Sequence, residues 1–209
     1  NEYLTEKEVI QNIRSNSENE VKIEAKVYDK YDISYFKDLL IENNIPINYD
    51  NVTGECKNSH TPNYRTVSMF YHIKKSLEMI DSKNDDDLII LYRNDYKLID
   101  YDMEMIKKKL EESDVLVFRD TKIGIPDSYF IFKNKFKKYF INAFDEMFDF
   151  YRFYYNDKSH QLKYGKNFNV PELFVKQYID SKNLKYSFAK KILQMEKLIT
   201  YTDNDKKKM

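Results

Sequence analysis

One apolar run, bounded by polar residues, constrains the fold of this chain more than any other feature. Residues 85–102 read DDDLIILYRNDYKLIDYD, and the centre of this stretch, residues 88–92, is continuously apolar. Such a run predicts a central strand that is buried on both faces of a parallel-type sheet. The run ends at Arg93, Asn94 and Asp95, where the chain is expected to leave the sheet. In open α/β folds ligands bind beyond the carboxyl ends of the strands, so these three residues are candidates for a binding site.

Strands and helices are expected to alternate along the rest of the chain. Alternating apolar and charged residues predict a strand with one buried face at residues 21–27, and apolar runs predict further strands at 115–118 and 129–132. Helical spacing of apolar residues predicts helices at residues 5–15, 34–40, 65–80, 103–110 and 135–155, with Asn134 as the cap of the last, and a helix that begins at Pro171. This alternation predicts an α/β fold class, a three-layer sandwich around a mainly parallel (mixed) sheet.

Length and charge balance limit the kinds of protein that this chain can be. Its 209 residues, of which 42% are hydrophobic, suffice for one domain with a sizeable core, expected at residues 1–202 and followed by a charged tail at 203–209. The 35 basic and 35 acidic residues are interleaved, which argues against a nucleic-acid-binding protein. The sequence has neither an apolar run long enough for a membrane span nor a signal-peptide pattern. A single cysteine excludes an internal disulfide, so a reducing, cytoplasmic location is expected.

Missing motifs exclude several common catalytic and nucleotide-binding sites. The three glycines, Gly54, Gly124 and Gly165, are far apart, so neither a GxGxxG dinucleotide loop nor a GxxxxGK phosphate loop is present. The GxSxG pattern of α/β-hydrolases and the HExxH pattern of zinc proteases are absent as well. Any nucleotide site in this chain must therefore be built in another way.

The residues at the end of the central strand suit a metal ion and the phosphates that it holds. The carboxylate of Asp95 is a hard ligand of the kind that Mg²⁺ and Mn²⁺ prefer, and Arg93 can make paired hydrogen bonds to a phosphate. The same two side chains can form a surface ion pair, and the residues alone leave both interpretations open. The triplet at residues 85–87 also spells an acidic D-x-D pattern, but it precedes the strand and is interpreted as a solvated turn at the opposite edge of the sheet.

Four motifs in a fixed order give the chain a likeness to a known family. They are NYRTVSMFYHIKK at residues 63–75, the strand with R-N-D at 89–95, PDSYF at 126–130 and FNVPEL at 168–173. With these motifs the chain resembles small glycosyltransferases of the GT-A type, including virus-encoded (chlorella virus) and capsule-sugar members. It departs from them in two places. No short apolar strand with an S-G-x-x-R turn precedes the first helix, and R-N-D lacks one carboxylate of the family's D-x-D motif.

The resemblance implies a metal-dependent enzyme whose donor is a nucleoside-diphosphate sugar such as a UDP- or GDP-sugar. It implies Mn²⁺ or Mg²⁺ as the cofactor, bound at Asp95, and donor contacts from Arg93, Asn94, Asp95 and Arg65. A divalent ion stabilises the departing diphosphate as a Lewis acid. The implied acceptor is a glycan or glycoprotein, which for a virus-encoded member is a capsid glycan made in the host cytoplasm.

An inverting transferase also needs a carboxylate that takes the proton of the acceptor hydroxyl. Asp127 and Glu172 lie in the family-like motifs, and Asp127 is the preferred candidate. Each residue has a structural alternative, because Asp127 after Pro126 suits a turn and Glu172 in a first helical turn suits the helix dipole. A retaining transferase would need no such base, and the sequence leaves the two classes open.

Two other classes of protein compete with the enzyme interpretation. The first is a non-catalytic protein, either a degenerate nucleotide-sugar fold or an aromatic-rich protein-interaction module. The second is a nucleic-acid-associated protein that uses lysine-rich loops and tyrosine stacking. Stabilisation by a nucleoside diphosphate only in the presence of a divalent metal would distinguish the enzyme from both.

Overall fold

A computed structural model describes residues 33–47, 63–92, 96–119, 124–126, 129–157, 171–189 and 192–197. The helix expected at residues 5–15, the strand expected at 21–27 and the tail expected at 203–209 lie outside the described residues.

The described elements are helices and strands mixed along the chain, but they do not alternate strictly, because pairs of helices and pairs of strands follow one another. The helices are α2 (Ile33–Glu42), α3 (Asn63–Glu78), α4 (Met103–Glu112), α5 (Lys137–Asn156) and α7 (Pro171–Ser181), and a 3₁₀ turn, Asn134–Phe136, precedes α5. The strands are β1 (Leu88–Tyr92), β2 (Tyr96–Tyr101), β3 (Val115–Val117), β4 (Tyr129–Lys133), β5 (Tyr186–Phe188) and β6 (Leu193–Lys197). The strands predicted at β1, β3 and β4 are confirmed, whereas β2, β5 and β6 were not predicted from the sequence.

The main sheet is mixed, as predicted, and has the strand order β1-β4-β3-β5. Strand β4 runs antiparallel to both of its neighbours, and β5 runs parallel to β3. Hence β1, β3 and β5 share one direction and β4 alone is reversed. Three of the four strands therefore run in the same direction, as expected for a mainly parallel sheet. Their pairing differs from that expectation, because only β3 and β5 form a parallel pair. Strands β2 and β6 form a separate antiparallel pair.

Strand β1 is not central in the described sheet, which corrects the expectation from its apolar run. It stands at one end of the strand order. Of its side chains only Ile89 is fully buried, and Tyr92 is 44% exposed. A continuous apolar run shows that both faces of a strand meet apolar neighbours, but it carries no information about which strands pair with its edges.

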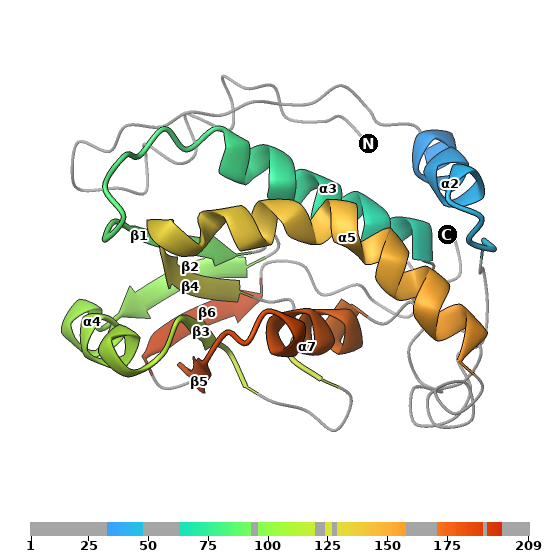
Figure 1. Cartoon of the computed structure of the whole chain (residues 1–209). Coiled ribbons are helices and arrows are strands. Elements are labelled where there is room, and N and C mark those ends of the chain that lie inside the picture. Colours follow the sequence, from blue (N-terminus) through green and yellow to red (C-terminus); the bar gives the residue numbers. More distant parts are fainter. Residues whose placement is uncertain are drawn as a thin grey trace, which may run out of the picture.

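Both faces of the main sheet are covered by helices, which agrees with a layered α/β fold. Along β4, Phe130 and Phe132 point into a core that α2, α3, α5 and α7 complete, whereas Tyr129 and Ile131 point into a second core with α4. Figure 1 shows α3 and α5 lying side by side. Helix α7 packs into the same core as these two helices, and α4 packs into the second core. The rings of Phe132 and Phe140 stack at 4.1 Å, which ties β4 to α5.

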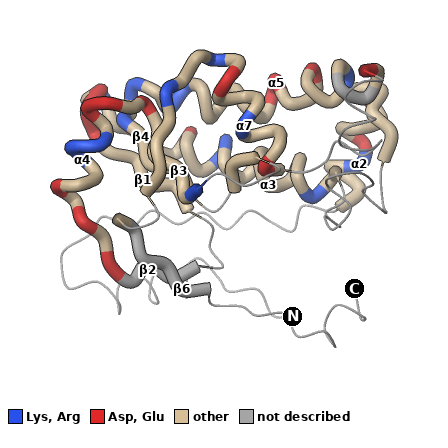
Figure 2. The backbone as a smooth tube through the Cα atoms, turned by 90° about the horizontal axis from the view of Figure 1, so that it is seen from below, with Lys and Arg blue, Asp and Glu red and all other residues tan. Residues whose placement is uncertain are grey.

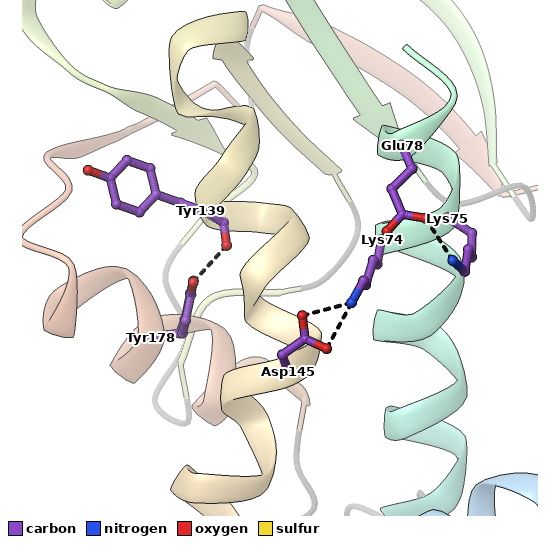
Figure 3. Close-up of polar contacts among 6 residues, drawn as sticks. All are labelled: Lys74, Lys75, Glu78, Tyr139, Asp145 and Tyr178. Carbon is purple, nitrogen blue, oxygen red and sulfur yellow. Dashed lines mark hydrogen bonds and ion pairs between the residues drawn. The ribbon is translucent and has the colours of Figure 1, made fainter. Parts of the chain in front are cut away.

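The helices that cover the larger core are also joined by polar contacts, which Figure 3 shows. Lys74 of α3 bridges both carboxylate oxygens of Asp145 on α5, at 2.8 and 2.7 Å. The hydroxyl of Tyr178 on α7 donates to the backbone oxygen of Tyr139 on α5 at 2.6 Å. Asp145 is 56% exposed, so its ion pair stabilises the fold little, whereas Tyr178 is only 3% exposed and its bond is shielded from water.

The Tyr178→Phe variant is expected to lower the free energy of unfolding by about 1 kcal/mol, because it removes a buried hydroxyl that donates to a backbone oxygen. Urea denaturation measures this loss. Glu78→Ala is a matched control, because it breaks a partly exposed pair with Lys75 inside one helix and should change stability by about 0.5 kcal/mol or less. Equal stability of Tyr178→Phe and the unmodified protein would contradict the prediction.

Asn134 does not cap the aromatic helix, contrary to the interpretation from the sequence. The 3₁₀ turn starts at Asn134, and Lys133, which precedes it, makes no side-chain cap. The buried Asn134 side chain instead donates to the backbone oxygens of Ser82 at 3.0 Å and Asn84 at 3.1 Å. Asn134 thus fastens the turn before β1 to the start of α5, a long-range contact that sequence spacing does not reveal.

Candidate functional site

Three strands of the main sheet end at the same edge, called here the carboxyl edge. Tyr92, the last residue of β1, pairs with Tyr129, the first residue of β4. Val117, the last residue of β3, pairs with Phe130 of β4 and with Phe188, the last residue of β5. The chain therefore leaves β1, β3 and β5 and enters β4 at the carboxyl edge. This is the position at which open α/β sheets bind their ligands.

The predicted site residues follow or precede these strand ends in the chain. Arg93, Asn94 and Asp95 come directly after β1, and Asp127 comes shortly before β4. All four lie outside the described residues, so the metal site and the alternative surface ion pair both remain predictions. What the described strands add is that the flanking residues Tyr92 and Tyr129 are direct cross-strand partners.

Between β3 and β4, residues 124–126 pack against the first turn of α7. Gly124, Ile125 and Pro126 are buried, and the backbone N–H of Ile125 donates to the backbone oxygen of Glu172 at 3.0 Å. A Cβ added to Gly124 would lie 2.2 Å from the same Glu172 oxygen. Only glycine fits in this space, so the contact between the loop and α7, called here the Gly124 clamp, depends on the missing side chain.

The Gly124 clamp joins the first turn of α7, which holds the base candidate Glu172, to residues that shortly precede the other candidate, Asp127, in the sequence. Helix α7 begins at Pro171, as predicted, and Glu172 is half-buried in its first turn. Asp127 follows directly after the buried Pro126. The role of Gly124 was not predicted from the sequence. The available signal was a lone glycine before Ile-Pro in an otherwise polar loop.

Arg65, the fourth predicted donor contact, is exposed in the first turn of α3. Near it, the buried Asn63 donates from its side chain to the backbone oxygen of Pro46 at 2.8 Å, which fixes the start of the helix. None of the described contacts joins Arg65 to the carboxyl edge. Its role in donor binding therefore remains a prediction.

The acidic triplet at residues 85–87 lies at the opposite edge of the sheet, as predicted. It precedes Leu88, which pairs with Lys133 at the end of β4. The Asp86 carboxylate accepts from Lys133 at 2.7 Å, and this hydrogen bond and the charge of Lys133 lower the pKa of Asp86. The Asp87 carboxylate accepts from Ser82 at 2.5 Å and from Asn84 at 2.8 Å. These contacts give the triplet a structural role in a turn.

The described residues also limit other kinds of site. Among them no group of three or more His, Cys, Asp or Glu side chains is placed to hold a metal ion. None of their helices is both long and apolar enough to cross a membrane. Figure 2 shows basic and acidic positions interspersed along the described helices, in keeping with the balanced charge of the sequence.

Comparisons of the chain with protein-family models, with curated proteins and with solved structures find no match in any of the three.

Proposed function

We propose that the protein is a metal-dependent glycosyltransferase with a GT-A-like fold, which moves a hexose from a nucleoside-diphosphate sugar to a glycan or glycoprotein. The observation that carries this proposal is the convergence of strand ends at the carboxyl edge. There β1 leads into Arg93–Asp95, and β4 is preceded by Asp127. The proposed phosphate- and metal-binding segment thus follows Tyr92 in the sequence, and the candidate base precedes Tyr129, the cross-strand partner of Tyr92.

The donor side of the proposed site is the R-N-D segment. Asp95 would hold Mn²⁺ or Mg²⁺, and Arg93 and Asn94 would contact the diphosphate. A single carboxylate fits such an ion, because Mg²⁺ is usually held by one or two carboxylates together with substrate phosphates and water. When bound, the ion would supply Lewis-acid stabilisation of the charge on the departing diphosphate.

The acceptor side of the proposed site is the loop before β4 and the first turn of α7. In an inverting reaction the acceptor oxygen bonds to the anomeric carbon while the bond from that carbon to the phosphate oxygen breaks. The diphosphate leaves with the electron pair of the broken bond. Asp127, or Glu172 in its place, accepts the proton of the acceptor hydroxyl. The Gly124 clamp supports this assignment, since it fixes the backbone of Glu172 against Gly124 and Ile125, which shortly precede Asp127 in the sequence.

Thermal unfolding in the presence of UDP or GDP, with and without Mn²⁺, tests the proposal. A ligand that binds only the folded protein raises the unfolding temperature, so the enzyme should be stabilised by a nucleotide together with Mn²⁺ and not by either alone. A lack of any stabilisation would overturn the proposal and favour a non-catalytic interaction module. Stabilisation by single-stranded nucleic acid instead would favour the nucleic-acid interpretation.

The Asp95→Ala variant is expected to fold normally and to lose the metal-dependent part of nucleotide binding. The reason is that Asp95 follows a strand end and would be the metal ligand. Calorimetry with UDP or GDP and Mn²⁺ measures the affinity. Asp86→Ala is the matched control, because Asp86 is an exposed aspartate at the opposite edge of the sheet, and its affinity should stay within a few-fold of the unmodified protein. Unchanged affinity in Asp95→Ala, or an equal loss in Asp86→Ala, would contradict the metal assignment.

A further inference from the structure

We draw no further inference here: the strongest candidate, the outer edge of β5 at the end of the main sheet with the exposed ring of Phe188, is only three residues long, and nothing in the described part of the chain shows what covers it.

Discussion

Gly124→Ala is expected to destabilise the protein by about 2–4 kcal/mol, because the added Cβ has no room. It would lie 2.2 Å from the Glu172 oxygen and 2.6 Å from the Glu172 carbonyl carbon, both of which are backbone atoms of a helix. The loop must move away from α7, which lengthens the 3.0 Å hydrogen bond from Ile125 to Glu172 and shifts the fully buried Ile125. The estimate adds overpacking of about 1–3 kcal/mol to a lost hydrogen bond of about 1 kcal/mol.

Thermal unfolding measures this effect. For a chain of this length the loss corresponds to a fall of roughly 5–15 °C in the midpoint temperature. Ile125→Val is the matched control in the same segment. It removes a methylene group without adding an atom, so it should lower stability by only about 0.5–1.5 kcal/mol. A Gly124→Ala protein that unfolds within about 2 °C of the unmodified protein would show that the Gly124 clamp is not tight.

Asp127→Asn is expected to lower sugar transfer by about 10²- to 10⁴-fold, the usual contribution of a positioned general base. The amide is nearly isosteric with the carboxylate, so the fold and donor binding should be kept. The donor site is assigned to Asp95, in a different loop. Parallel measurement of donor affinity by calorimetry and of turnover with a nucleotide sugar separates the two effects.

Glu172→Gln is the informative partner of that variant. If Asp127 is the base, Glu172→Gln should change turnover by only a few-fold. If Glu172 is the base, the larger loss should appear in Glu172→Gln instead. Normal turnover in both variants would refute a carboxylate base at either position and point to a retaining reaction. The assignment of the donor side would survive that result, because it depends on Asp95.

The local structure of the described chain could largely be predicted from its sequence, because local patterns are set by local chemistry. Apolar runs located β3 and β4, and Pro171 located the start of α7. Pairing between strands is set by contacts far apart in sequence, so neither the end position of β1 nor the reversal of β4 could be predicted. Strand β5 has only three residues, too few for any period to appear.

The candidate site was predictable in kind but not in detail. The polar break after β1 marked the carboxyl edge, because a strand that ends in charged residues must leave the sheet there. Neither the Gly124 clamp nor the packing of Phe118 against Tyr129 follows from spacing, since both join segments whose meeting depends on the folded chain. The same holds for Asn134, whose side chain has a turn as its partner and not the helix that follows it.

The position of the reversed strand β4 determines when the main sheet can form during synthesis of the chain. Within the described sheet β4 is the common neighbour of β1 and β3, which are both made before it and do not pair with each other. Until the ribosome has released β4, the facing edges of β1 and β3 expose unpaired backbone groups, the kind of edge that invites pairing with other chains. A nascent or truncated product that stops before Tyr129 should therefore aggregate more readily than the full chain.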